Sequence, residues 1–577
     1  MQFHRWRLAP SRGWCPAMAR LLPTSLRQLR RPPLAIRAHS SQPDRFNYIA
    51  DEFSQEEPTT LTQVIAQFSD GPAIKLYDAA ELARFNHPPR PSICLARDFI
   101  HDSLYNPNYG YFFNQVEIFD RAADPLQTPS SPAGQAKLAD WAESFEDELY
   151  AEYFDPTSGL QHNQLRVRRQ RPDEQPTQQQ QQHRPPDPSH AHQRQIWHTP
   201  TELFKPWYAW SMASYIVQKH LEESKRNRQP PKELKIYEIG AGNGTLCVGI
   251  LDYIKEHHGQ LYEQTRYTTI ELSTRLAERQ RAKIRLSGHE GRARVVNRSI
   301  LGLAGCAELK QGPEEPCWVL GMEVLDNLSR DVVRRDRVSG QALQSIVITD
   351  HDGDYHERFI PITPQNNPSL LAYLKLFNLH PLNHLHHSRP KVLLERLLAK
   401  YLPFRSNLTN HQFIPTNYLI LLQNIFALFP NHRLILSDFS HLPNTLNDPR
   451  ANRLGAPVVQ TRYNGVTVPA STFLVQPGMF DIFFPTDFGE LVTLYTRLRQ
   501  QHQPREQAAR GGRGRAAEEA PGRPDVQVAV HAQNSLLVDL LSRPAMHDKI
   551  LKKSAGVGLD LDRIFAYYQN VKVLTVT

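Results

Sequence analysis

Residues 234–247 read LKIYEIGAGNGTLC, in which an apolar segment runs through Glu238 into three alternating glycines, Gly240, Gly242 and Gly244, and then into a helical pattern. Alternating glycines let the backbone turn tightly and approach a ligand closely, because no Cβ atoms stand in the way. The helix that follows presents unpaired N–H groups at its first turn. A strand, a glycine turn and a helix in this order predict a site for a nucleotide-containing cofactor.

Spacing separates the two cofactor classes that use such a turn. A dinucleotide site requires G-x-G-x-x-G and an acidic residue about 20 residues further on. Here Thr245 stands in place of the third glycine, and the next acid at a strand end, Glu271, lies 29 residues beyond Gly242. The pattern E-x-G-x-G-x-G instead resembles motif I of class I S-adenosylmethionine methyltransferases. In these enzymes the acid before the glycines faces the amino-acid end of the cofactor, and the acid closing the second strand binds the ribose hydroxyls. Glu238 and Glu271 match these two places.

Strand and helix patterns alternate from residue 234 onward. Apolar, β-rich segments occur at 234–239, 267–272, 293–297, 317–323 and 433–438, separated by helical patterns such as 246–257 and 274–286. This alternation predicts a doubly wound, Rossmann-like α/β fold with a parallel sheet. Segments 526–530 and 571–576, with a helix at 534–541 between them, are expected to complete a seven-stranded sheet.

The N-terminal segment accounts for the positive charge of the chain. Residues 1–43 contain eight arginines and no Lys, Asp or Glu, whereas the whole chain carries a formal net charge of +8. The charge therefore belongs to this segment, and we expect no nucleic-acid-binding face. Its composition and helical spacing resemble a mitochondrial transit peptide, placed at residues 1–41. The alternative is a disordered basic tail.

Composition divides the rest of the chain into unlike parts. We expect an N-terminal helical cap at 42–120, a disordered Gln/Pro-rich insert at 121–195, and a cofactor-binding domain at 196–577 with a second insert near 500–525. No segment approaches the about 20 apolar residues of a membrane span. The four cysteines beyond residue 43 form no C-x-x-C pair. Neither structural zinc nor a disulfide framework is expected.

The residues after the fourth predicted strand are candidates for contact with a substrate, because ligands of open α/β sheets gather at the carboxyl ends of the strands. Glu323 and Asp326 stand three apart there and are expected to face one acceptor together. Paired carboxylates suit a guanidinium, since bidentate contacts fix its plane and aim one nitrogen at a transferred methyl group. The structural alternative is that Glu323 caps a helix and Asp326 is solvated.

Six blocks of the sequence resemble the MidA-like methyltransferases. They are LYNP with GYF at 104–112, TPTELF at 199–204, EIGAGNG at 238–244, EVLD at 323–326, SDF at 437–439 and PGMFDI at 477–482. The resemblance implies a class I fold with a helical cap and S-adenosylmethionine as the methyl donor. It also implies symmetric dimethylation of an arginine in a core subunit of complex I in the mitochondrial matrix, in support of complex I assembly. The implied site comprises Glu238, Gly240, Gly242, Gly244 and Glu271 for the cofactor and Glu323 and Asp326 for catalysis, with no metal.

Two further hypotheses belong to other classes of protein. Met322 and Ser329 stand where the MidA-like family has Asn and Pro. These differences motivate a non-catalytic assembly factor that keeps the fold as a binding platform. An NAD-dependent oxidoreductase would need a glycine at position 245 and an acid nearer the turn, and the sequence has neither.

Overall fold

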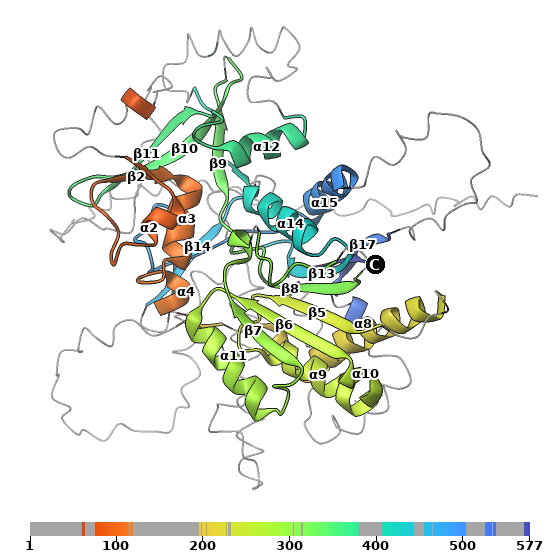
Figure 1. Ribbon diagram of the computed structural model, residues 1–577. Coiled ribbons are helices and arrows are strands. Elements are labelled where there is room, and N and C mark those ends of the chain that lie inside the picture. Colours follow the sequence, from red (N-terminus) through yellow and green to blue (C-terminus); the bar gives the residue numbers. More distant parts are fainter. Residues whose placement is uncertain are drawn as a thin grey trace, which may run out of the picture. The chain divides into compact units, whose positions relative to one another are not determined.

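The computed structural model describes residues 61–63, 75–114, 116–118, 195–197, 199–203, 205–226, 228, 232–303, 305–312, 315–337, 339–379, 398, 407–442, 455–463, 466–502, 526–533, 535–537 and 570–577 (Figure 1). The transit peptide predicted at 1–41, almost all of the Gln/Pro-rich insert and the second insert beyond His502 lie outside the described residues and stay predictions. Within the described ranges, no helix combines the length and the apolar character needed to cross a membrane.

A seven-stranded sheet follows the predicted segments closely. Its order is β17–β18–β13–β8–β5–β6–β7. The strands are β5 (Leu234–Ile239), β6 (Thr265–Glu271), β7 (Ala293–Asn297), β8 (Cys317–Met322), β13 (His432–Phe439), β17 (Val528–Ala532) and β18 (Val571–Val576). β7, β6, β5, β8 and β13 are parallel, and β18 runs antiparallel to both of its neighbours. All seven predicted strands are confirmed, although β8 ends one residue before the predicted end at Glu323.

Helices cover both faces of this sheet, as the doubly wound prediction requires (Figure 1). One face packs against α8 (Trp207–Arg226), α9 (Thr245–His257) and α11 (Thr274–Leu286), and the other against α14 (Thr416–Leu428) and α15 (Phe488–His502). Successive residues of β5 show the alternation, since Ile236 belongs to the first core and Tyr237 to the second. The short α10 (Gly259–Glu263) and the 3-10 turn η2 (Ile300–Gly302) lie in the connections. Burial of alternate residues on two apolar faces explains the continuous apolar character of the central strands.

A second sheet of six strands was not predicted. β1 (Leu76–Tyr77) and β2 (Ser92–Leu95) join β10 (Ala342–Thr349), β9 (Asp331–Arg335) and β12 (Gln412–Ile414) in this order, and β11 (Tyr355–Pro361) pairs with β10. The N-terminal cap does contain helices, namely α2 (Ala79–Leu82), α3 (Ala96–Tyr105) and α4 (Tyr111–Asn114). The cap is nevertheless mixed in structure, because β2 pairs antiparallel with β10, a strand that lies about 250 residues later in the sequence.

Smaller elements complete the described part of the chain. β3 (Val116–Ile118) pairs in parallel with β4 (Gln195–Trp197), which is followed by α7 (Pro200–Leu203). β14 (Val458–Tyr463) lies between β15 (Val466–Pro469) and β16 (Asp481–Phe483) in a three-stranded sheet, and α12 (Pro368–Leu376) follows β11.

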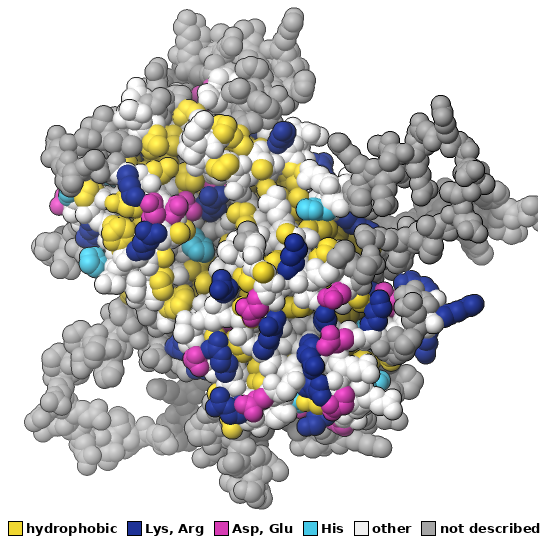
Figure 2. All heavy atoms as spheres, in the orientation of Figure 1, with side chains coloured by type: hydrophobic (Ala, Val, Ile, Leu, Met, Phe, Trp, Pro, Cys, Tyr) yellow, Lys and Arg dark blue, Asp and Glu magenta, His cyan; other side chains and the backbone are white. Residues whose placement is uncertain are grey.

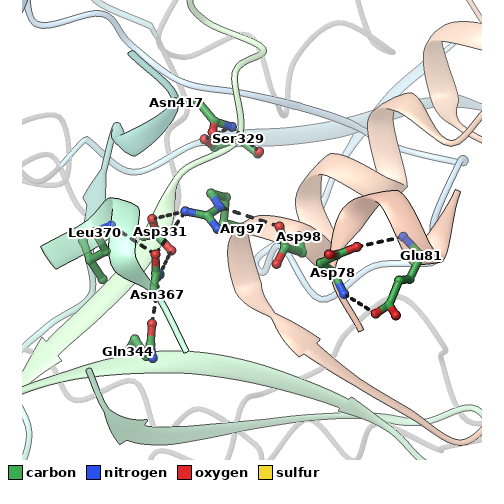
Figure 3. Close-up of polar contacts among 10 residues, drawn as sticks. All are labelled: Asp78, Glu81, Arg97, Asp98, Ser329, Asp331, Gln344, Asn367, Leu370 and Asn417. Atoms are coloured by element: carbon green, nitrogen blue, oxygen red, sulfur yellow. Dashed lines mark hydrogen bonds and ion pairs between the residues drawn. The ribbon is translucent and has the colours of Figure 1, made fainter. Parts of the chain in front are cut away.

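Arg97 fixes α3 to the second sheet (Figure 3). Its Nη1 donates to Asp331 Oδ2 at 3.0 Å and to Asn367 Oδ1 at 3.3 Å. Asn367 also donates to Asp331 Oδ1 at 2.7 Å and caps α12 by accepting the Leu370 N–H. Asp331 is only 2% exposed, so the guanidinium compensates a buried carboxylate. This network positions α3 relative to β9 and α12.

Charges of both signs share the surface around α9, α10 and α11. Figure 2 shows Lys and Arg side chains interspersed with Asp and Glu over this region. Several of these side chains form ion pairs, among them Arg281 with Glu278 and Arg285 with Glu290. The basic residues of α11 therefore do not form a surface of one sign.

Candidate active site

A cavity of about 200 Å³ lies at the carboxyl ends of β5, β6 and β8. Residues of the glycine turn, of the segment after β8, and of α3, α4 and α7 line it together. Glu238, Gly240, Gly242, Glu271 and Glu323 are among the lining residues. The structure therefore brings five of the seven predicted site residues to one cavity. The other two, Gly244 and Asp326, are each next in sequence to a residue that lines it.

The glycine turn has the backbone that its composition predicts. Gly240, Gly242 and Gly244 have φ values of +66°, +52° and +77°. A Cβ on Gly240 would lie 3.0 Å from Val324 Cγ2, and one on Gly244 would lie 3.2 Å from Gln280 Cγ. The left-handed backbone and the close neighbours together require glycine at these two positions. The turn leads directly into α9, whose first residue is Thr245.

Gln280 of α11 joins the turn to Glu271, and the sequence contained no signal for this role. Its Nε2 donates to Gly242 O at 2.9 Å and to Glu271 Oε2 at 3.0 Å, while its Oε1 accepts from Thr269 Oγ1 at 2.8 Å. Glu271 Oε1 accepts the Ser273 N–H at 2.9 Å. Burial raises the pKa of Glu271 to about 7, although these hydrogen bonds oppose the rise. The carboxylate is held rigidly at the end of β6 and retains lone pairs for a ligand.

Glu238 is a buried acid at the end of β5. It is 3% exposed, and its Oε2 accepts a hydrogen bond from the Tyr267 hydroxyl at 2.8 Å. Burial raises the pKa of Glu238 to about 8, against the effect of the Tyr267 hydrogen bond. A cationic group of a ligand in the cavity would favour the ionised form of this carboxyl.

The segment after β8 separates the two predicted catalytic acids. Glu323 has a left-handed backbone, with φ +53°, and its N–H donates to Ser437 O at 2.8 Å. Glu323 lines the cavity, and its carboxylate accepts no hydrogen bond from the described residues. Asp326 does not line the cavity and is only 1% exposed. Glu323 therefore lines the cavity and Asp326 does not, and a contact of both acids with one acceptor stays a prediction. The alternative of a solvated Asp326 is wrong, because this residue is buried.

A group of buried acids lies beside Glu323. Asp438 Oδ2 accepts the N–H groups of Leu325 and Asp326 at 2.8 and 3.1 Å. Asp326 Oδ1 and Asp481 Oδ2 accept no hydrogen bond from the described part of the chain. Burial raises the pKa of all three aspartates and of Glu323, and the charge of Asp438 adds to the rise for Asp326 and Glu323. A cation that approached these carboxyls would favour their ionised forms.

The cap supplies an aromatic wall to the cavity, formed by His101 and Tyr105 of α3 and Phe112 and Phe113 of α4. The rings of Tyr105 and Phe112 stack with centroids 5.2 Å apart and planes inclined by 11°. The Tyr105 hydroxyl donates to Asn327 O at 3.2 Å, which ties the wall to the segment after β8. Burial lowers the pKa of His101 to about 4, so this ring is neutral at physiological pH.

Two of the sequence blocks that resemble the family, those at 104–112 and 477–482, pack against each other. The N–H of Gly478 donates to Ser103 O at 3.1 Å, and a Cβ on Gly478 would lie 1.9 Å from Tyr109 O. The Pro-Gly block therefore supports the turn that leads from α3 into α4. Asp481 of the same block accepts from Asn327 Nδ2 at 3.3 Å.

The fold and the cavity define a class I S-adenosylmethionine methyltransferase: a seven-stranded sheet, a glycine turn at the end of β5 and an acid at the end of β6. The chain belongs to a family of S-adenosyl-L-methionine-dependent methyltransferases, whose model matches residues 213–504. S-adenosylmethionine is therefore the cofactor, as predicted.

More remote likenesses accompany this match. The mitochondrial protein arginine methyltransferase NDUFAF7 homolog of Schizosaccharomyces pombe is 22% identical over 242 residues, 41% of this chain and 49% of that protein. The chain thus spans about half the length of this relative. A methyl transferase structure from Burkholderia thailandensis with bound S-adenosyl-homocysteine is 15% identical, with a TM-score of 0.38, and covers 66% of this chain and 78% of its own. A second structure from this organism is 14% identical with the same TM-score, and covers 78% and 94%.

Proposed function

We propose that this protein is a mitochondrial protein arginine N-methyltransferase that modifies a core subunit of complex I and supports complex I assembly. The observation that carries the proposal is Glu323. This residue lines the cavity, its carboxylate has no hydrogen-bond partner among the described residues, and buried acids lie beside it. A guanidinium is the protein side chain best suited to such a group, because it offers two parallel N–H donors and a positive charge.

The residues around the turn fit the cofactor. S-adenosylmethionine supplies an electrophilic methyl group on a sulfonium when it is bound. Glu271 would accept the ribose hydroxyls, and Glu238 would bind at the amino-acid end, where a cation would keep it ionised. Gly240 and Gly242, which line the cavity, have no Cβ atoms, so the backbone can approach the ligand. The aromatic wall excludes water from the acceptor side of the cavity.

Glu323 has two tasks in this proposal. It fixes the plane of the guanidinium, so that one nitrogen points at the methyl group. It also accepts the proton that this nitrogen loses as the nitrogen–carbon bond forms and the sulfur–carbon bond breaks. A carboxyl with a raised pKa suits the second task, because it holds a proton more readily than an exposed glutamate. Asp326 and Asp438 act indirectly, by adding negative potential beside Glu323 and by holding the backbone of the segment.

Support for the location and the substrate comes from two sources. The arginine-rich residues 1–41 resemble a transit peptide. The relative from S. pombe is described as a mitochondrial protein arginine methyltransferase, although the shared region is about half of its length.

The test compares Glu323→Gln with Glu290→Gln, a change of an exposed glutamate in the turn after α11. Both purified proteins are titrated with S-adenosylmethionine and then incubated with it and a mitochondrial extract from cells lacking the enzyme. We expect Glu323→Gln to bind the cofactor within about twofold of the wild type and to lose at least about 100-fold in methylarginine formation, measured by mass spectrometry. Equal methylation by Glu323→Gln and wild type would show that this carboxylate has no catalytic role.

The same variant separates the enzyme from a non-catalytic assembly factor. If methylation supports assembly, Glu323→Gln will not restore complex I in cells that lack the protein, whereas Glu290→Gln will. Full restoration by a variant that forms no methylarginine would favour the assembly-factor hypothesis.

A further inference from the structure

Glu202 of α7 contacts the glycine turn from a buried position. It is 2% exposed and lines the cavity. Its Oε1 accepts from Thr245 Oγ1 at 2.6 Å and from Asn243 Nδ2 at 3.1 Å, and its Oε2 accepts from Lys205 Nζ at 3.3 Å. Both polar side chains of the turn are thus bound to one carboxylate that lies more than 35 residues away in the sequence.

The same two turn side chains are also held from α11. Arg279 Nη1 donates to Asn243 Oδ1 at 2.8 Å, and Lys283 Nζ donates to Thr245 Oγ1 at 2.5 Å. Each turn residue therefore bridges an acid on α7 and a base on α11. The threonine at position 245 is the residue that excluded a dinucleotide site in the sequence, and its hydroxyl is needed for this bridge.

We propose that Glu202 is a positioning residue that holds the glycine turn in its cofactor-binding conformation. Three left-handed glycines within five residues have large conformational freedom when the turn is not constrained. Fixing them costs free energy, which must come either from contacts within the protein or from the cofactor. The hydrogen bonds to Glu202 fix Asn243 and Thr245, which flank Gly244, before the cofactor binds. Without them the cofactor would have to order the turn, and its affinity would fall.

Glu202 also connects the turn to the aromatic wall. β4 ends at Trp197, three residues before α7 begins at Pro200, and it pairs in parallel with β3, which begins two residues after the end of α4. The backbone and the pairing of β3 with β4 therefore connect α4 to α7 and Glu202. Ordering of the turn by the cofactor is expected to stabilise α4 by this route.

The experiment measures the Kd for S-adenosylmethionine by titration calorimetry on the full-length protein, and it does not depend on the identity of the methyl acceptor. Glu202→Ala is expected to raise the Kd by about tenfold or more, since hydrogen bonds to a charged group are lost. Glu202→Gln should recover most of the affinity, because its amide oxygen still accepts from the turn. Thr245→Val should weaken binding as well. The double variant should lose less affinity than the product of the two single effects, because both changes remove the bond between Glu202 and Thr245.

Glu357→Gln is the matched control. Glu357 is a buried glutamate of the second sheet that accepts from Ser345 Oγ at 2.6 Å and contacts His411 Nε2 at 3.0 Å. Its replacement is expected to lower the melting temperature without changing the Kd. An unchanged Kd in Glu202→Ala, or multiplied effects in the double variant, would overturn the proposal. If Glu202→Ala does not fold, an unchanged Kd in Thr245→Val would overturn the proposal instead.

Hydrogen exchange tests the connection to the wall. Addition of S-adenosylmethionine should slow amide exchange in α4 of the wild type, and this protection should be lost in Thr245→Val at saturating cofactor. Equal protection in both proteins would show that α4 responds to the cofactor by another route.

Discussion

Gly478 offers a direct test of how the cap is fixed, through the change Gly478→Ala. Its φ is +82°, and an added Cβ would lie 1.9 Å from the carbonyl oxygen of Tyr109. A carbon and a carbonyl oxygen normally approach no closer than about 3.3 Å. The two backbone segments would have to separate by roughly 1.4 Å, which would break the hydrogen bond from Gly478 to Ser103 O.

Three costs add up in this variant. A left-handed backbone at alanine costs about 1–2 kcal/mol. Overpacking of a close contact costs about 1–3 kcal/mol. The lost backbone hydrogen bond costs about 1 kcal/mol. We expect Gly478→Ala to reduce the free energy of unfolding by about 3–6 kcal/mol.

Two other glycines separate these costs. Gly305 has φ +80° and no atom within 4 Å of an added Cβ, so Gly305→Ala should cost only the about 1–2 kcal/mol of the backbone. Gly291 also has open space, without a left-handed backbone, so Gly291→Ala should change the stability by less than about 0.5 kcal/mol. Urea unfolding followed by circular dichroism measures all three. If Gly478→Ala and Gly305→Ala agree within about 1 kcal/mol, the packing of the two blocks does not constrain the cap as argued.

Three more predictions concern ionisable groups. The affinity for 5′-methylthioadenosine, which has the ribose hydroxyls but no amino-acid end, should rise from pH 6 to pH 8, because the ionised Glu271 is the better acceptor and its pKa in the free protein is about 7. Titration calorimetry should show that the affinity of Glu271→Gln for 5′-methylthioadenosine does not change with pH. If the affinity of the wild type does not change with pH either, Glu271 does not bind the ribose hydroxyls. Tyr267→Phe removes a hydrogen bond that lowers the pKa of Glu238, so S-adenosylmethionine binding should weaken more at pH 7.5 than at pH 9.5. An equal loss at both pH values would refute this. Arg97→Leu should lower the free energy of unfolding in urea by about 3–5 kcal/mol, because Asp331 would stay buried without its ion-pair partner. Asp331→Asn should recover part of this loss in the double variant. No recovery would argue against the ion pair.

The seven-stranded sheet was predictable because its signals are local. Each strand is a continuous apolar segment bounded by helical periodicity, and both faces of the sheet are buried, so periodicity and length identify the elements. The glycine turn was predictable for a similar reason, since left-handed backbone and close approach restrict the residue type at each position. The two acids at the ends of β5 and β6 followed from their places relative to these strands.

The second sheet and the supports of the site were not predictable in this way. β2 and β10 pair across about 250 residues, and no local pattern records which distant strand completes a hydrogen-bonded edge. Glu202 and Gln280 act through partners that only the folded chain brings near. The burial of Asp326 outside the cavity lining was not predictable either, because a spacing of three implies a shared face only in a helix, and Glu323 has a left-handed backbone.

The sequence by itself determined the class of fold and the position of the cofactor turn, because these depend on backbone propensities and on burial patterns within short segments, and its resemblance to motif I indicated the cofactor. Tertiary structure alone decided which of the two predicted acids lines the cavity, which residues contact the turn and how the cap is attached. These features depend on contacts between segments far apart in the chain, and the direction and environment of a side chain such as Glu323 or Asp326 follow only from the packing around it.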